Sequence, residues 1–122
     1  MAKRIMVVDD SRMIFLQIQK LLEGTDYEAA AYCRDGEEAV AQYAQIAPDL
    51  VTMDIIMPGM DGLEAAQAIL EEHPEAKIIM VSSLADDDTF EEAKTIGAKG
   101  FIDKPFDKES LLEVLRKVSE EK

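Results

Sequence analysis

The sequence MDIIMPGMDG, residues 53–62, carries the features on which the predicted fold depends. It completes an apolar run that begins at Leu50 and stops at the carboxylate of Asp54, and a Pro-Gly turn follows before Gly62 opens a helical pattern. Such a run is too short for a helix and is bounded by turn residues, so it predicts a buried parallel strand with Asp54 at its carboxyl end. In open α/β sheets ligands bind at that edge. Asp54 is therefore a candidate helix cap, metal ligand or nucleophile.

Apolar runs of this kind alternate with helical patterns along the whole chain. The expected strands cover residues 5–8, 27–31, 50–53, 78–81 and 100–102. The intervening segments repeat apolar residues at the spacing of one helix face. Alternating strands and helices predict βα units, a parallel sheet and helices on both of its faces. We therefore predict an α/β fold, a flavodoxin-like (βα)5 three-layer sandwich with a five-stranded sheet in the order 2-1-3-4-5.

Length and composition indicate one small globular domain. We expect residues 1–122 to form that domain with no effector domain, because no linker, repeat or low-complexity tract divides the chain. The single cysteine, Cys33, cannot form an internal disulfide, which favours a cytoplasmic location. The apolar run at residues 5–8 is too short for a signal peptide or a membrane span.

The charge balance argues against two classes of partner. The chain carries 26 acidic and 13 basic residues, a net charge of −13. Nucleic-acid backbones and anionic membranes would be repelled by such a surface. We therefore expect no direct nucleic-acid binding and no membrane insertion.

Polar residues follow the predicted strands at the carboxyl edge of the sheet. The first strand leads to Asp9 and Asp10, the third to Asp54, the fourth to Ser82 and the fifth to Lys104. The first and third strands are neighbours in the predicted order, so their carboxylates would repel one another unless a cation joined them. Oxygen ligands with room for water favour Mg²⁺ over Ca²⁺. A cation and a lysine suit a phosphoryl group, which Asp54 can accept as a nucleophile.

These residues resemble the receiver domain of bacterial two-component response regulators, close to the standalone chemotaxis type called CheY-like. The matching motifs are VVDD at residues 7–10, MD at 53–54 with MPGMDG at 57–62, VSS at 81–83 and KPF at 104–106. They occur in the order found in the family and span almost the whole chain. Each motif alone is weak, but their combination at matching strand ends is specific.

The resemblance implies a role for each acidic residue at the edge. Asp54 corresponds to the phosphoacceptor of the family. Asp9 and Asp10 correspond to the acidic pair that holds Mg²⁺ together with Asp54, and the backbone carbonyl of Ile56 would be a further ligand.

The resemblance also implies a phosphate contact and a switch. Lys104 corresponds to the family's phosphate lysine, and its peptide bond to Pro105 is expected to be cis. Ser82 stands where the family has a hydroxyl that contacts the phosphoryl group. Phe101 stands at the switch aromatic, whose rotation with Ser82 would report phosphorylation to the face of the fourth helix, fifth strand and fifth helix.

Two features depart from the commoner family pattern. Ile56 and Leu84 occupy variable positions that flank the site, and both are apolar. We expect them to obstruct the attacking water and slow hydrolysis of the phosphorylated form. Phe101 lacks a hydroxyl, so any switch would work by packing.

An apolar stretch in the first predicted helix exceeds what one buried face can hold. Residues 13–16 read MIFL, and at about 100° per residue they cannot all face the sheet. The stripe through Ile18 takes Ile14 and Phe15 inward, which leaves Met13 and Leu16 on the outer face. Exposed apolar residues beside the acidic site predict a docking patch for a partner helix, although scattered surface residues are the alternative.

The sequence therefore predicts a signalling switch rather than a turnover enzyme. A histidine kinase would transfer a phosphoryl group from a phosphohistidine to Asp54, with Mg²⁺ bound, and the protein would catalyse only its own phosphorylation and dephosphorylation. The downstream partner would be a protein such as a flagellar motor switch protein or a phosphorelay partner. We expect a monomer, with dimerisation on phosphorylation left open.

Other functions stay open at this point. The protein can instead be a phosphorelay intermediate or a phosphate sink. A Mg²⁺-dependent phosphohydrolase is a second class, but such enzymes usually need a carboxylate two residues beyond the nucleophile, where this chain has Ile56. A flavin-binding module is a third, but the clustered carboxylates would repel the phosphate of the flavin.

Overall fold

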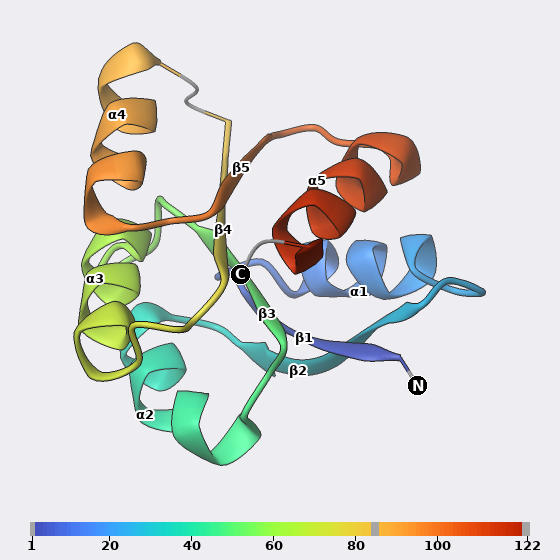
Figure 1. Cartoon of the computed structure of the whole chain (residues 1–122), viewed down its shortest axis with the longest axis horizontal. Coiled ribbons are helices and arrows are strands. Elements are labelled where there is room, and N and C mark those ends of the chain that lie inside the picture. Colours follow the sequence, from blue (N-terminus) through green and yellow to red (C-terminus); the bar gives the residue numbers. More distant parts are fainter. Residues whose placement is uncertain (1, 84–85, 121–122) are drawn as a thin grey trace.

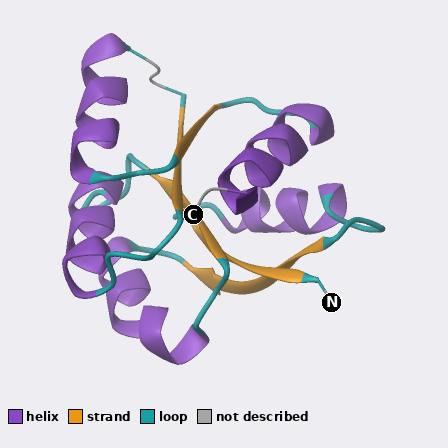
Figure 2. Cartoon of the chain, viewed as in Figure 1, coloured by secondary structure: helices purple, strands orange, loops and turns teal. Residues whose placement is uncertain are grey.

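The computed structural model describes residues 2–83 and 86–120, and within them five strands alternate with five helices (Figure 2). The strands are β1 (Lys3–Val8), β2 (Tyr27–Cys33), β3 (Leu50–Asp54), β4 (Ile78–Ser82) and β5 (Gly100–Asp103). The helices are α1 (Arg12–Leu21), α2 (Gly36–Ile46), α3 (Gly62–Glu72), α4 (Asp87–Ile96) and α5 (Lys108–Glu120).

The strands form one parallel sheet that lies between two helical layers. Its order is β2-β1-β3-β4-β5, which confirms the predicted order. Helices α2, α3 and α4 cover one face, and α1 and α5 cover the other (Figure 1). The chain reverses its direction of strand addition between β1 and β3, and in such sheets ligands bind at that switch point.

Each face of the sheet buries its own apolar cluster. Successive side chains of a strand point to opposite faces, so Val51 and Met53 pack toward α2, α3 and α4 while Leu50 packs toward α1 and α5. Every residue of β3 and β4 is buried. The central strands therefore form a rigid base for the residues at their carboxyl ends.

Strand β2 continues two residues further than the predicted range of 27–31. Its pairing with β1 shifts register between Ile5 and Met6, and beyond this irregularity Val8 pairs with Cys33. The backbone N–H of Asp9 then donates to the carbonyl of Cys33 at 3.1 Å. The extension brings Tyr32 to the same edge of the sheet as the acidic residues.

The turn after β3 is held against the strand that it leaves. The N–H of Gly62 donates to the carbonyl of Ile55 at 2.8 Å. Asp61 begins α3 with a capping box, in which its side chain accepts from the N–H of Glu64 and the Glu64 side chain accepts in return. A Cβ on Gly62 would overlap the backbone oxygen of Asp54. Glycine at position 62 therefore lets α3 start directly against the end of β3.

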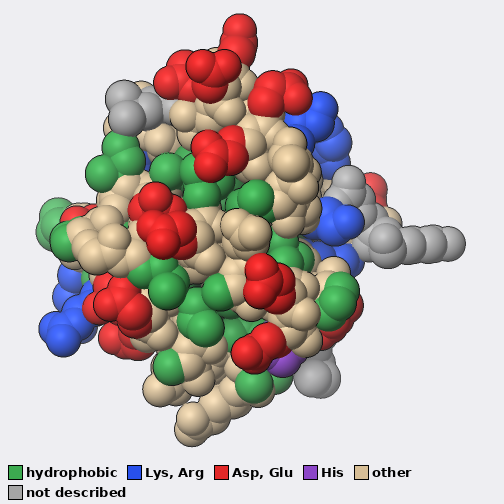
Figure 3. All heavy atoms as spheres, turned by 90° about the vertical axis from the view of Figure 1, so that its left-hand side faces the viewer, with side chains coloured by type: hydrophobic (Ala, Val, Ile, Leu, Met, Phe, Trp, Pro, Cys, Tyr) green, Lys and Arg blue, Asp and Glu red, His purple; other side chains and the backbone are tan. Residues whose placement is uncertain are grey.

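The face formed by α2, α3 and α4 is acidic. Asp and Glu side chains are spread across it, and Lys and Arg lie at its margins (Figure 3). Such a face offers little attraction for a nucleic-acid backbone. None of the helices in the described residues is both long enough and apolar enough to cross a membrane.

Replacing Gly62 with alanine tests the tight contact between α3 and β3. We expect Gly62→Ala to lower the free energy of unfolding by on the order of 3 kcal/mol, because the added methyl group meets backbone rather than a flexible side chain. Gly24→Ala is the control, since a Cβ there has open space and only the positive φ of 76° opposes it, at a cost of about 1 kcal/mol. Urea unfolding measures both, and equal losses would contradict the tight contact.

Candidate functional site

Three carboxylates meet at the carboxyl edge of the sheet. Asp9 and Asp10 follow β1, and Asp54 ends β3. Each offers an oxygen atom, and these oxygens all lie within 4.8 Å of one another. Asp9 and Asp54 are buried, with 2% and 6% of their surfaces exposed, whereas Asp10 is exposed. Burying like charges this close is costly unless a positive charge compensates.

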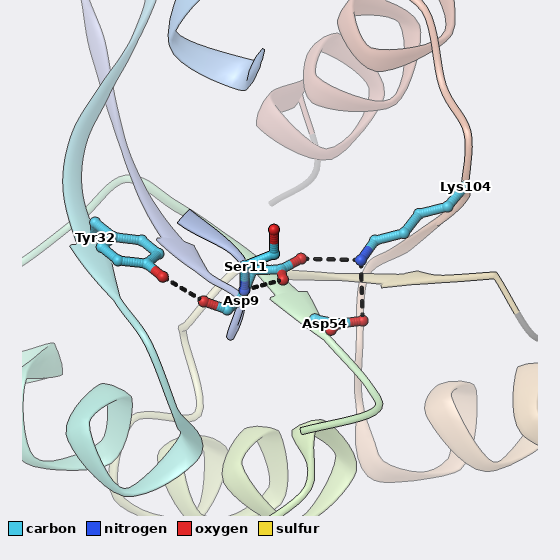
Figure 4. Close-up of polar contacts among 5 residues, drawn as sticks. All are labelled: Asp9, Ser11, Tyr32, Asp54 and Lys104. Carbon is cyan, nitrogen blue, oxygen red and sulfur yellow. Dashed lines mark hydrogen bonds and ion pairs between the residues drawn. The ribbon is translucent and has the colours of Figure 1, made fainter. Parts of the chain in front are cut away.

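Lys104 supplies the compensating charge within the protein (Figure 4). Its Nζ donates to Oδ2 of Asp9 at 2.9 Å and lies 3.4 Å from Oδ1 of Asp54. The N–H of Lys104 donates to the carbonyl of Ser82 at 2.9 Å, and the peptide bond to Pro105 is cis, as the family resemblance implied. Lys104 pairs with only two of the three carboxylates, Asp9 and Asp54, so the site keeps a net negative charge.

The electrostatics of the site are visible in the pKa values of its groups. Burial, and after it the charge of Asp9, raise the pKa of Asp54 to about 6, although Lys104 opposes both effects. Burial lowers the pKa of Lys104, but its hydrogen bond with Asp9 and the charges of Asp54 and Asp9 outweigh this effect and raise it overall. Lys104 is therefore a cation at neutral pH, and Asp54 ionises at an energetic cost.

The carboxylates fit a hard divalent cation. Their oxygens are close enough to share one ion, and the charge left after pairing with Lys104 is negative. All-oxygen ligation is the preference of Mg²⁺. Ile56 lies two residues after Asp54 and is 54% exposed, between the buried residues Ile55 and Met57 that anchor the loop.

The proposed switch residues lie on the neighbouring strands. Ser82 ends β4, is 1% exposed and pairs in register with Asp103 of β5. Phe101 is half-buried on β5, and its ring meets the ring of Phe90 edge-on at a centroid distance of 5.7 Å. Leu84, predicted to flank the site, lies outside the described residues.

Sequence reasoning missed Tyr32. Its hydroxyl donates to the backbone carbonyl of Asp9 at 2.8 Å, and its ring stacks on Phe15 of α1 at a centroid distance of 5.1 Å. Burial raises the pKa of Tyr32, and the charges of Asp9 and Asp10 add to this, so the hydroxyl keeps its proton. The predicted second strand ended at residue 31, which hid the position of Tyr32 at the edge.

Met13 and Leu16 lie on the outer face of α1, as the helical spacing of the sequence predicted. Met13 is 72% exposed and Leu16 is 45% exposed, whereas Ile18 is buried. Both exposed residues lie on the helix that directly follows Asp9 and Asp10. Their function in docking stays a prediction.

Comparison with known proteins agrees with this geometry. The response regulator receiver domain model matches residues 5–116, and the chain therefore belongs to the response regulator receiver domain family. Chemotaxis protein CheY of Thermotoga maritima is 40% identical over 119 residues, which cover 98% of this chain and 99% of that protein. Protein CcdB of Bacillus subtilis is 41% identical over 115 residues, covering 94% of this chain and 96% of that protein.

The structural likeness is equally extensive. A chain from the CheX–CheY–BeF3–Mg²⁺ complex of Borrelia burgdorferi matches with a TM-score of 0.91 and 33% identity, covering 95% of this chain and 88% of that one. The family resemblance inferred from the motifs is thus confirmed.

The raised pKa of Asp54 predicts a pH-dependent stability. Because the folded pKa of about 6 exceeds the ordinary value of 3.8, the folded state binds the proton more tightly. Stability from this group is therefore full below about pH 4 and is lost as the pH rises through 6. Without divalent cations, we expect Asp54→Asn to raise the free energy of unfolding at pH 7.5 by on the order of 2 kcal/mol, and by much less at pH 4.

Urea unfolding of both proteins in EDTA at each pH measures the difference. Asp107→Asn is the control, because hydrogen bonds from Ser110 lower the pKa of that exposed helix cap and no gain is expected there. An equal effect of Asp54→Asn at pH 4 and pH 7.5 would show that Asp54 is not electrostatically strained.

Proposed function

We propose that the protein is a phosphorylation switch in which Asp54 accepts a phosphoryl group from the phosphohistidine of a histidine kinase. The observation that carries the proposal is the meeting of three carboxylates with Lys104 at the end of a fully buried strand. A phosphoryl group at Asp54 would lie beside both a lysine and a cation site. Transfer of this kind depends on positioning and on charge neutralisation more than on covalent machinery.

The reaction exchanges one bond to phosphorus for another. A carboxylate oxygen of Asp54 attacks the phosphorus, the P–N bond to the histidine breaks, and the imidazole leaves with the bonding electron pair. Lys104 is held beside Asp54 and pairs with oxygens of the incoming group. A bound Mg²⁺, held by Asp9, Asp10, Asp54 and the carbonyl of Ile56, would neutralise further charge. The hydroxyl of Ser82 would donate a hydrogen bond to another phosphoryl oxygen.

The output surface that we propose is the face of α4, β5 and α5. Phe101 of β5 lines a pocket of about 400 Å³ on this face. The aromatic and cationic residues that line the pocket are Phe90, Lys94, Lys99, Phe101 and Lys117. Movement of Ser82 toward a phosphoryl group would free space for Phe101 to turn inward and reshape this pocket. Because Phe101 has no hydroxyl, the change is one of packing.

The output is therefore binding of another protein, and the kinase-dependent pathway that we favour is chemotaxis. CheY proteins are among the relatives, and the CheY of Borrelia burgdorferi was solved with CheX. A flagellar motor switch protein is the downstream partner that this proposal favours, with a phosphorelay partner as the alternative. We propose a cytoplasmic monomer that can dimerise when phosphorylated. The exposed Ile56 would shield the phosphorylated Asp54 from water.

Phosphorylation by a small donor tests the proposed function. We expect intact mass spectrometry after incubation with acetyl phosphate to show one phosphoryl adduct that requires both Mg²⁺ and Asp54. Asp54→Asn lacks the nucleophile and should give no adduct, whereas Asp107→Asn should react like the wild type. An adduct on Asp54→Asn, or none on the wild type with Mg²⁺ present, would contradict the proposal.

A charge on the outer face of α1 tests the docking patch. We expect Leu16→Glu to slow phosphotransfer from the cognate kinase by about tenfold, because an introduced carboxylate would be desolvated in an apolar contact. Its reaction with acetyl phosphate should not change. Gln67→Glu is the control for the added charge, since Gln67 is exposed on α3, which covers the opposite face of the sheet from α1. Equal loss with both phosphodonors would refute a docking role for Leu16.

A further inference from the structure

The backbone N–H, the backbone carbonyl and both side-chain oxygens of Asp9 each make a hydrogen bond. Its N–H donates to the carbonyl of Cys33 at 3.1 Å, and its Oδ1 accepts from the N–H of Ser11 at 2.9 Å. Its Oδ2 accepts from Lys104 at 2.9 Å, and its carbonyl accepts from the hydroxyl of Tyr32 at 2.8 Å. Figure 4 shows that Tyr32 and Lys104 approach Asp9 from opposite sides.

That carbonyl belongs to the peptide unit that joins Asp9 to Asp10. The peptide bond is planar, so fixing its oxygen fixes the direction in which the chain enters Asp10. Among the described residues none makes a hydrogen bond or ion pair with the side chain of Asp10, which is exposed. The position of the Asp10 carboxylate near Asp9 and Asp54 therefore depends on the backbone that precedes it.

Tyr32 can hold this peptide because its own ring is held. The ring lies between strand β2, which carries it, and Phe15 of α1, on which it stacks with an interplanar angle of 29°. Stacked aromatic pairs contribute beyond the area that they bury. Because this packing restricts the ring, the hydroxyl of Tyr32 stays in position to donate its hydrogen bond to the Asp9 carbonyl. The contact thus connects β2 and α1 to the loop that carries two of the proposed cation ligands.

We propose that Tyr32 is a positioning residue of the cation site, which orients the Asp9–Asp10 peptide so that the Asp10 carboxylate faces Asp9 and Asp54. The inference rests on the proposed function, because it assigns Tyr32 to the site where Mg²⁺ would bind. None of the family motifs includes position 32. Residues that orient ligands from behind are a general feature of metal sites.

Removal of one oxygen atom tests the inference. Tyr32→Phe keeps the ring and its stack on Phe15 but releases the Asp9 carbonyl. Tyr27→Phe is the matched control on the same strand, because its hydroxyl lies 3.4 Å from Ser119 and far along β2 from the site. In Mg²⁺ titrations followed by backbone amide chemical shifts, we expect Tyr32→Phe to weaken binding by about tenfold and Tyr27→Phe to leave it unchanged.

Two further readouts separate positioning from a general structural effect. In the absence of metal, the Asp10 amide shift and its hydrogen-exchange rate should change in Tyr32→Phe while the amides of α3 do not. At saturating Mg²⁺, the rate of reaction with acetyl phosphate should return to that of the wild type. Unchanged Mg²⁺ affinity in Tyr32→Phe, or a rate that stays low at saturation, would overturn the assignment of Tyr32 alone. Absence of Mg²⁺ binding by the wild type would instead overturn the proposed function.

Discussion

The repulsion among Asp9, Asp10 and Asp54 is the constraint on which the rest of the site depends. The fold brings three carboxylates within 4.8 Å at the end of buried strands and places one lysine beside them. Burial and the charge of Asp9 raise the pKa of Asp54, so the ionised carboxylate is energetically unfavourable in the folded protein. A cation or a bound phosphoryl group with its cation relieves that cost. The scaffold thus stores unfavourable electrostatic energy where binding and reaction can release it.

The scaffold can hold this arrangement because its centre is rigid. Strands β3 and β4 are buried along their whole length, and both faces of the sheet are covered by helices. The backbone of Gly62 closes the turn after Asp54, so α3 begins directly against the strand end. The movement that we propose is that of the Phe101 ring, which contacts the ring of the exposed Phe90. Rigid support beneath the carboxylates and adjustable packing beside them suit a switch better than a turnover enzyme.

Much of this architecture could be predicted from the sequence, since short apolar runs ending in Asp9 and Asp54 are a strong local signal. The sheet order and the family are confirmed. The predicted end of β2 was wrong. An irregularity in its pairing with β1 shifts the register, and no local residue pattern indicates this shift. Tyr32 was missed for the same reason. Its contact with Asp9 joins residues that are 23 positions apart, so only the folded chain brings them together.

The most direct test of the account is the ionisation of Asp54 itself. The ¹³C shift of its side-chain carboxyl, followed by NMR from pH 4 to pH 8, reports the protonation of that one group. The account predicts a pKa of about 6 in EDTA and a clear decrease when Mg²⁺ is added, because the cation removes the repulsion. A pKa near the ordinary value of 3.8 that does not respond to Mg²⁺ would contradict it.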